Sequence, residues 1–264
     1  MDRKILFFDM DGTLWDYKNY IPESTVRAIK LAQKNGHVAF INTGRSRSFI
    51  RERNILDIGF DGIVSGCGTM IEYEGRVVFA RFFPEGEIDR ILEATSRYHF
   101  KLIVEGTKCL YANAREFYGD DRDGYYIKKI EREMGEDLKP LSCVREGKIQ
   151  KFSCSTMGCD RAGFMEELAD DYDFIEHNDI VMEVVPRGYN KGTGIKKVCE
   201  LLGADEKDTL AFGDSINDKE MLIEAGTGIV MGSGTDEAKQ YADYVTTGLL
   251  EDGIINAMKH FDLI

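Results

Sequence analysis

The sequence lacks the features that mark membrane-spanning, zinc-binding and disulfide-rich proteins. No apolar run approaches the roughly 18 to 20 residues that a membrane-spanning helix needs. The four histidines are far apart without zinc-site spacing, and the six cysteines include no C-x-x-C pair. The charged residues 1–4 precede a short strand rather than the apolar core of a signal peptide. We therefore expect a cytoplasmic protein with reduced, mostly buried thiols.

Positive charge is also scarce. The chain has 34 lysines and arginines against 47 aspartates and glutamates, which gives a formal net charge of -13. Nucleic acids and anionic membranes are bound through positive fields, so neither is an expected partner. With 264 residues and 43% hydrophobic content, the chain is long enough for two domains with sizeable cores. We expect a monomer or weak dimer.

Two carboxylates follow the first apolar run of the sequence. Residues 4–8 predict a buried strand, and Asp9-Met10-Asp11-Gly12-Thr13-Leu14 comes directly after it. Carboxylates two residues apart on an extended chain share a face but lie roughly 6.6 Å apart along the strand, so a turn is needed to bring both to one reaction centre. Gly12 suits such a turn. A helix N-cap or a solvated loop remains the alternative explanation for this segment.

Three further segments extend the pattern in a recognisable order. Asn42-Thr43-Gly44-Arg45 follows an apolar run, Lys191 lies in residues 186–192, and Gly213-Asp214-Ser215-Ile216-Asn217-Asp218 follows residues 209–212. Together with the D-x-D-x-T segment at Asp9, they resemble the four motifs of the haloacid dehalogenase-like (HAD) phosphohydrolases. A predicted insertion over residues 83–186, between the second and third motifs, resembles the large-capped Cof-type branch, subfamily IIB.

The resemblance implies a role for each motif residue. Asp9 would be a nucleophile that forms an aspartyl-phosphate, Asp11 the acid and base, and Lys191 a cationic catalytic group. The implied Mg2+ ligands are Asp9, the main-chain carbonyl of Asp11, Asp214 and Asp218. The implied phosphate-binding residues are Met10, Asp11, Thr43, Gly44, Lys191 and Asn217. Arg45 and Asn190 are candidate substrate contacts, although Arg45 could equally form a surface ion pair, and Asn217 and Asp218 could order the phosphate, the metal's waters or Lys191.

The chemistry requires these residue types together. A phosphate monoester dianion repels an anionic nucleophile unless a metal and cationic donors neutralise the phosphoryl oxygens. Magnesium prefers oxygen ligands and takes only one or two carboxylates from a protein, which fits the carboxylates of Asp9 and Asp214. The sequence does not decide the pKa of Asp11, because nearby carboxylates raise it whereas a metal and Lys191 lower it.

The order of predicted elements indicates an α/β protein. Strands and helices alternate in residues 1–82 and 187–264, which predicts a Rossmann-like, doubly wound parallel-sheet core with all four motifs at or near the carboxyl ends of strands. Residues 83–186 predict an inserted α+β substrate-specificity cap. Specific local predictions are a helix over Ser24–Asn35 capped by Ser24, a hairpin across Glu74-Gly75, and a helix over Arg161–Asp170. We expect Ala162, Met165 and Leu168 on one face of that last helix, and a solvated loop at residues 120–124.

One segment departs from the family pattern. Many Cof-type sequences have Asn-Gly-Ala after the third core strand, whereas this chain has Ser65-Gly66-Cys67-Gly68. A side-chain contact assigned to that Asn therefore does not transfer. Cys67 is either near the site or simply a small residue in a tight turn.

We therefore predict a magnesium-dependent phosphatase that hydrolyses a small phosphorylated metabolite, with sugar phosphates as the first candidates, through an aspartyl-phosphate. A phosphotransferase such as a sugar phosphomutase is the nearest alternative, because it shares the motifs and differs in what accepts the phosphoryl group. A non-catalytic metabolite-binding regulatory protein is an alternative of another class.

Overall fold

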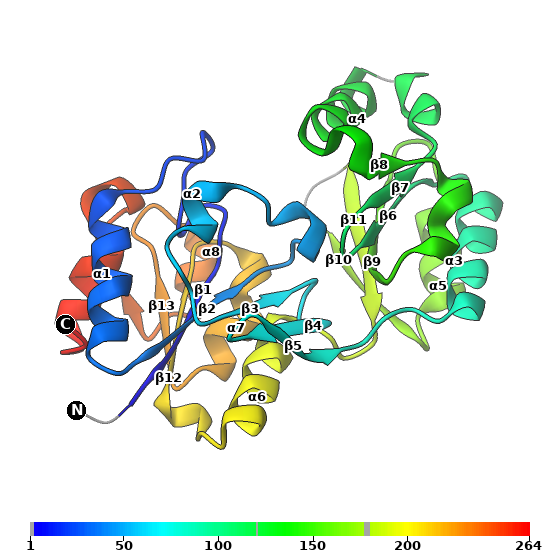
Figure 1. Cartoon of the computed structure of the whole chain (residues 1–264). Coiled ribbons are helices and arrows are strands. Elements are labelled where there is room, and N and C mark those ends of the chain that lie inside the picture. The colour runs from blue at the N-terminus through cyan, green and yellow to red at the C-terminus, as the bar shows by residue number, and fades with distance from the viewer. Residues whose placement is uncertain (1–2, 120, 177–179) are drawn as a thin grey trace. The chain divides into compact units, whose positions relative to one another are not determined.

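The computed structural model describes residues 3–119, 121–176 and 180–264, and it contains two compact units, each built around its own sheet (Figure 1). Unit 1 comprises residues up to Gly44, Arg51–Ala80 and Asn190–Ile264. Unit 2 comprises Arg45–Ile50 and Arg81–Tyr189. The short segment Arg45–Ile50 therefore belongs to unit 2, although unit 1 precedes and follows it in the sequence.

The sheet of unit 1 has eight strands in the order β14-β13-β12-β1-β2-β3-β4-β5. All pairs from β14 to β3 are parallel, and β4 and β5 add an antiparallel hairpin at one end. The predicted Rossmann-like α/β core is confirmed. The strands are β1 (Ile5–Phe8), β2 (Val38–Asn42), β3 (Gly62–Ser65), β4 (Met70–Tyr73), β5 (Arg76–Ala80), β12 (Thr209–Gly213), β13 (Thr227–Val230) and β14 (Tyr244–Val245).

Helices cover both faces of this sheet. On one face, α1 (Glu23–Lys34) contacts α9 (Gly253–His260), and on the other α6 (Lys191–Leu202) contacts α7 (Lys219–Glu224). Figure 1 shows α1 and α6 on opposite sides of β1 and β12. Alternate residues of β1, such as Ile5 and Phe7, pack in the core cluster that includes Ile195 of α6. The short helices α2 (Arg53–Leu56) and α8 (Asp236–Lys239) complete the unit.

Local sequence signals were partly right in unit 1. The hairpin turn at Glu74-Gly75 is confirmed, with φ of 49° and 72° at the two residues, as a two-residue type I′ turn requires. The prediction that Ser24 caps α1 is wrong. Pro22 is the N-cap, with φ -60° and ψ 139°, and Oγ of Ser24 is buried without a hydrogen-bond partner among the described residues.

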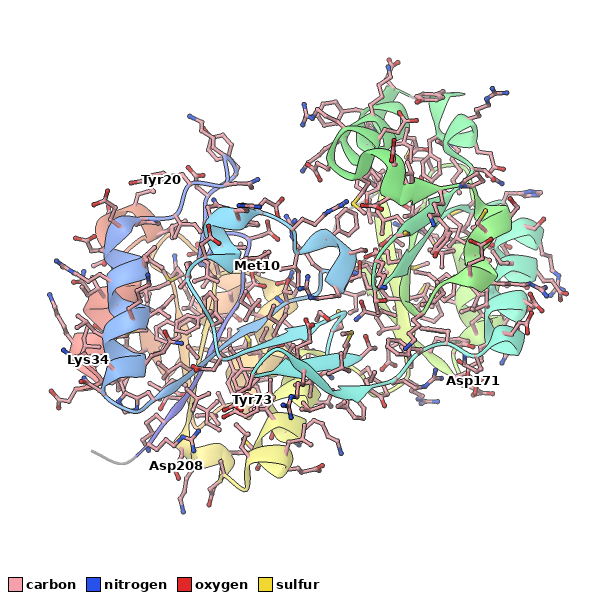
Figure 2. All side chains as sticks on the ribbon, viewed as in Figure 1. Met10, Tyr20, Lys34, Tyr73, Asp171 and Asp208 are labelled. Atoms are coloured by element: carbon pink, nitrogen blue, oxygen red, sulfur yellow. The ribbon has the colours of Figure 1, made fainter. Side chains whose placement is uncertain are left out.

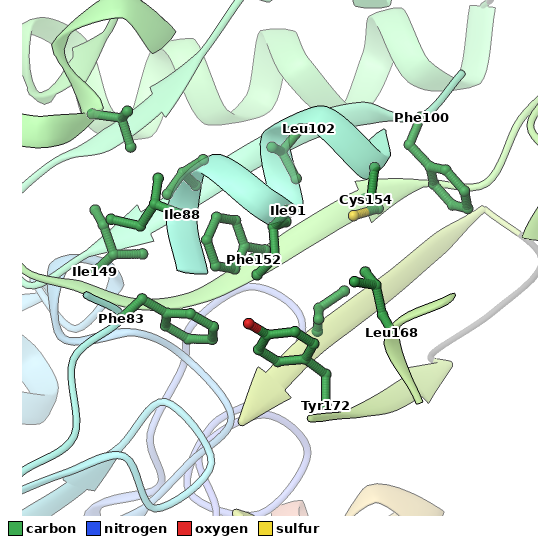
Figure 3. Close-up of a cluster of buried hydrophobic side chains, with 14 of the residues drawn as sticks. Phe83, Ile88, Ile91, Phe100, Leu102, Ile149, Phe152, Cys154, Leu168 and Tyr172 are labelled. Atoms are coloured by element: carbon green, nitrogen blue, oxygen red, sulfur yellow. The ribbon is translucent and has the colours of Figure 1, made fainter. Parts of the chain in front are cut away.

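The sheet of unit 2 has six strands in the order β10-β11-β9-β6-β7-β8. One face packs against α3 (Glu85–Arg97) and α5 (Arg161–Leu168) through an apolar cluster that includes Phe83, Ile91 and Phe152 (Figure 3). Apolar residues of α4 (Asp121–Met134) pack with β6 and β7 in a separate cluster. The strands are β6 (Lys101–Gly106), β7 (Leu110–Ala112), β8 (Leu138–Lys139), β9 (Ile149–Ser155), β10 (Tyr172–Glu176) and β11 (Val181–Pro186).

Two local predictions in unit 2 need correction. In α5, Leu168 is buried and Met165 packs against the core as expected, but Ala162 is exposed and Phe164 is the other buried residue. The stretch expected as a solvated loop begins α4 instead, although Asp120 lies outside the described residues. Asp123 is fully buried, where it pairs with Lys101 and accepts a hydrogen bond from Ser155. An acidic side chain was thus buried because a cation and a hydroxyl compensate it.

All six cysteines lie in the described part of the chain, and none forms a disulfide. Four are buried and two are half-buried, as expected from the sequence. Within the ranges that the structure describes, no helix is both long and apolar enough to cross a bilayer.

Candidate active site

Three of the four motifs follow neighbouring strands of unit 1. Asp9, Thr43 and Asp214 come directly after β1, β2 and β12, and β12, β1 and β2 are adjacent in the sheet. The carboxyl ends of parallel strands meet at one sheet edge, which is where open α/β sheets bind ligands. The fourth differs from expectation, because Lys191 begins α6 and the strand before it, β11, belongs to the other sheet.

A residue that the sequence reasoning missed places Lys191 at this edge. Asn42 is the last residue of β2, and its Nδ2 donates a hydrogen bond to the main-chain oxygen of Lys191 at 2.9 Å. Asn42 is fully buried, so this bond fixes the first turn of α6 beside the end of β2. The available signal was its position immediately before Thr43 in the second motif.

Lys191 bridges two buried carboxylates. Its Nζ donates to Oδ1 of Asp9 and to Oδ1 of Asp218, both at 2.6 Å, and all three side chains are at most 4% exposed. Burial by itself would lower the pKa of Lys191, but the charges of Asp218 and Asp9 and their hydrogen bonds outweigh it and raise the pKa. Lys191 is therefore a permanent cation.

The carboxylates outnumber the cations at this edge. Burial, and then the neighbouring carboxylates, raise the pKa of Asp9 well above its usual range, although Lys191 opposes the shift. Burial and the charge of Asp218 likewise raise the pKa of Asp214 to about 7, against a hydrogen bond from Thr13. Carboxylate oxygens of Asp9, Asp214 and Asp218 lie within 4.8 Å of one another. Such a cluster of oxygen donors fits a hard divalent cation.

Asp218 also organises the loop that carries Asp214. Its Oδ2 accepts hydrogen bonds from the main-chain amides of Asp214, at 2.9 Å, and Ser215, at 3.2 Å. Its Oδ1 accepts from Lys191. Both oxygens of Asp218 are thus engaged by protein groups. Asn217 is half-buried beside it, and its Oδ1 accepts a hydrogen bond from the Ser215 hydroxyl at 2.7 Å.

The first motif forms a tight loop around a buried main-chain carbonyl. Met10, which lies inside unit 1 (Figure 2), is fully buried, and its oxygen accepts hydrogen bonds from the amides of Leu14 and Trp15. Gly12 has φ +85°, and a Cβ there would lie 2.3 Å from Oδ2 of Asp214. The expectation of a turn at Gly12 is confirmed, and the close approach of Asp214 gives a second reason for glycine.

The two aspartates of this motif have different surroundings. Asp9 is 3% exposed within the charge cluster, so neither an N-cap nor a solvated loop describes it. Asp11 is exposed, and its Oδ1 accepts a hydrogen bond from Nε1 of Trp15 at 3.0 Å. Trp15 is fully buried. Its role was missed, although it is the single tryptophan of the chain and lies four residues after Asp11.

The second motif is held by the turn that departs from the family pattern. The amide of Thr43 donates to the oxygen of Val64 at 2.9 Å, and the oxygen of Thr43 accepts from the amide of Cys67 at 3.2 Å. Cys67 is buried with φ 56°, between two glycines that also have positive φ. Cys67 is thus a residue of a tight turn, and its main-chain amide also contacts the second motif.

The candidate substrate contacts lie in different units. Asn190 is the N-cap of α6, where its Oδ1 accepts from the amide of Thr193 at 2.8 Å and forms a capping box. Arg45 is the first residue of the unit 2 segment that follows Gly44. Contact of either residue with substrate stays a prediction.

Comparison with known proteins gives the family. The family model for haloacid dehalogenase-like hydrolases matches residues 6–258. The Bacillus subtilis protein named "Putative phosphatase YkrA" is 32% identical over 264 residues, which cover 100% of both chains. A hypothetical protein from Geobacillus kaustophilus HTA426 has a similar crystal structure, with a TM-score of 0.85, 28% identity and 100% coverage of both chains. The HAD subclass IIB sugar phosphatase BT4131 shares the fold, with a TM-score of 0.78 and 24% identity over 99% of this chain and 100% of that chain.

The match to the family model spans nearly the whole chain. The chain belongs to the haloacid dehalogenase-like hydrolase family.

Proposed function

We propose that this phosphatase is magnesium-dependent and hydrolyses a small phosphorylated metabolite through an aspartyl-phosphate on Asp9. The observation that carries the proposal is the buried ammonium of Lys191 held between Asp9 and Asp218, with Asp214 beside them. This arrangement places a carboxylate at a strand end beside a fixed positive charge. An anionic nucleophile needs such a charge because the phosphoryl oxygens of the ester would otherwise repel it.

The proposed reaction has two steps, phosphorylation of Asp9 and hydrolysis of the aspartyl-phosphate. A carboxylate oxygen of Asp9 attacks phosphorus, the ester P–O bond breaks, and protonated Asp11 gives its proton to the departing alcohol. Asp11 then accepts a proton from water, whose oxygen attacks phosphorus, and the bond to Asp9 breaks to release inorganic phosphate. The bond from Trp15 orients Asp11 for both proton transfers. Lys191 and the amides of residues such as Gly44 hold the phosphoryl oxygens.

The acidic cluster fits a magnesium ion. Asp9 and Asp214, together with the Asp11 carbonyl that the family resemblance adds, would form an all-oxygen set for a small hard cation. When bound, magnesium supplies positive charge that offsets the charge developing on the phosphoryl oxygens. Since both oxygens of Asp218 are engaged by Lys191 and two amides, we assign Asp218 to position Lys191 and Asp214 rather than to donate directly to the metal.

The proposed division of labour assigns phosphoryl chemistry to unit 1 and choice of leaving group to residues 83–186 of unit 2. Its support is that Asp9, Asp11, Lys191 and Asp214 all belong to unit 1. Sugar phosphates are the first substrates to test. A phosphomutase remains the second candidate, because only the acceptor of the phosphoryl group distinguishes it.

Phosphate release across a panel of phosphorylated sugars, nucleotides and cofactor esters, with magnesium present, tests the proposal. We expect release from a subset of the panel and complete loss of activity in excess EDTA, restored by magnesium but poorly by calcium. Interconversion of two isomeric sugar phosphates without net phosphate release would identify a mutase instead. Absence of release and of transfer for every compound would overturn the enzymatic assignment in favour of a metabolite-binding role.

A further inference from the structure

A short segment after the second motif folds with the other unit. Residues Arg45–Ile50, which we call the strap, leave unit 1 after Gly44 and return to it at Arg51. The strap contains a 3-10 turn at Arg47–Phe49. Ser46 and Ile50 on either side of the turn are 0% and 1% exposed. An excursion of six residues that is buried this well requires specific anchoring contacts.

Two polar side chains from the sheet of unit 2 provide these contacts. The amide of Arg47 donates a hydrogen bond to Oε1 of Gln150 at 2.8 Å, and Gln150 of β9 is itself fully buried. The hydroxyl of Ser46 lies 3.2 Å from that of Ser48 within the strap, and it lowers the pKa of the nearby Glu105 carboxyl on β6, which is 2% exposed. The strap is thus bound to unit 2 through a main-chain hydrogen bond, with the Ser46 hydroxyl near a buried carboxyl of the same unit.

The anchor is part of a larger buried network. Glu105 also accepts a hydrogen bond from Ser153, and Nζ of Lys151 lies 3.7 Å from its Oε1. Lys151 in turn pairs with Glu183 at 2.5 Å. Phe49 of the strap packs against the apolar cluster of β6, β7 and α4. Buried polar groups are costly to leave without partners, so these contacts hold the strap to unit 2.

The other end of the connection is fixed in unit 1. Both main-chain polar groups of Thr43 are engaged, the amide by Val64 and the oxygen by Cys67. Gly44 is therefore the single residue between Thr43, fixed in unit 1, and the strap, fixed in unit 2.

We infer that Gln150 and Ser46 are positioning residues for the phosphate-binding loop, because their anchoring of the strap sets the Gly44 peptide. This inference rests on the proposed function, which assigns the Gly44 amide to a phosphoryl oxygen. Its consequence is that the state of unit 2 controls phosphate affinity in unit 1 through the covalent chain. Neither residue touches the reacting atoms.

Two strap variants and a matched control test the inference. Gln150→Met keeps the size of the side chain but removes the acceptor of the Arg47 amide, and Ser46→Ala removes the hydroxyl that pairs with Ser48 and lies near Glu105. The control, Ser155→Ala, removes a buried hydroxyl from the same strand β9, where it donates to Asp123 rather than to the strap network. Hydrogen exchange of the peptide over residues 43–50 and calorimetric binding of inorganic phosphate with magnesium are measured for each protein.

We expect faster exchange over residues 43–50 and a Kd for phosphate raised at least about fivefold in both strap variants, since each leaves a buried polar group unpaired. The control should stay within about twofold of the parent. An unchanged Kd in the strap variants, with or without faster exchange, would overturn the inference, as would an equal loss in Ser155→Ala. Ser46→Ala carries the test if Gln150→Met does not fold. A parent protein that hydrolyses no phosphomonoester in the substrate panel would instead remove the proposed function, and this inference with it.

Discussion

Asp9, Asp214 and Asp218 surround a single buried lysine, and this imbalance of charge defines what the site can do. Lys191 satisfies one oxygen each of Asp9 and Asp218. The pKa values of Asp9 and Asp214 are nevertheless raised, first by burial and then by neighbouring carboxylates. A bound cation would relieve that repulsion, which supports the proposed magnesium dependence.

Replacement of the proposed nucleophile is the most direct test at this scale. Asp9→Asn should lower kcat by at least roughly 10³-fold, because only binding and electrostatic stabilisation remain. The measurement is phosphate release by protein whose circular dichroism matches the parent. Asp208→Asn is the matched control, since it removes an acidic partner of Lys4 just before β12, at the opposite edge of the same sheet. Near-parental turnover by Asp9→Asn would contradict a covalent intermediate.

The hydrogen bond from Trp15 to Asp11 gives a second prediction. Trp15→Phe should lower kcat about 3- to 10-fold for an alkyl phosphate, because Asp11 loses the donor that orients it. p-Nitrophenyl phosphate should be affected less, since nitrophenolate leaves without needing an acid. Parallel kinetics with the two substrates make the comparison. Equal losses would indicate that the variant acts through packing of the buried indole rather than through Asp11.

At the scale of elements, adjacency of strands assembles the motifs. β12, β1 and β2 are neighbours, and Asn42 at the end of β2 binds the first residue of α6. Asn190 begins that helix with a capping box, so the side chain predicted to contact substrate already has a structural role. In unit 2, the hydrogen bond that Gln150 accepts from the Arg47 amide holds the strap in the same way.

Glu105 predicts a dependence of stability on pH. Burial, together with the charge of Glu183, raises its pKa above the ordinary value of 4.5, although Lys151 and hydrogen bonds from Ser153 and Ser46 oppose the shift. The folded protein then retains a proton that the unfolded chain has lost, so Glu105 lowers the free energy of unfolding as pH rises from about 4.5 through the folded pKa. Glu105→Gln removes this titration.

We expect Glu105→Gln to gain stability relative to the parent as pH increases through that window. Urea unfolding followed by circular dichroism, repeated across a pH series, measures the difference in the free energy of unfolding. Curves that stay parallel from acid to neutral pH would contradict the prediction.

At the scale of the whole molecule, two units divide the proposed work. Alanine substitutions in loops of unit 2, such as Thr107-Lys108 and Thr156–Asp160, should change relative kcat/KM among phosphorylated metabolites more than they change hydrolysis of acetyl phosphate. Acetyl phosphate is the internal control, because it offers few leaving-group contacts. A uniform loss over all substrates would mean that unit 2 only excludes water, and specificity would then be sought in Arg45 and Asn190.

The sequence by itself determined the family, the α/β class and the residues of the candidate site. Asp9, Thr43 and Asp214 each follow a short apolar run, and such runs become adjacent parallel strands whose carboxyl ends share an edge. The Glu74-Gly75 hairpin was equally readable, because its turn depends on two adjacent residues. Signals of this kind are local, and tertiary context rarely reverses them.

Only the tertiary structure decided how distant residues compensate one another. The ammonium of Lys191 meets Asp9 and Asp218 across 182 and 27 positions of sequence, and Asp123 of α4 is buried because Lys101 of β6 and Ser155 of β9 reach it. The strap at Arg45–Ile50 joins unit 2 through Gln150, which is 103 residues beyond Arg47. Burial of charge depends on partners that folding supplies, and for this reason neither the pKa values at the site nor the anchoring of the strap follows from local sequence.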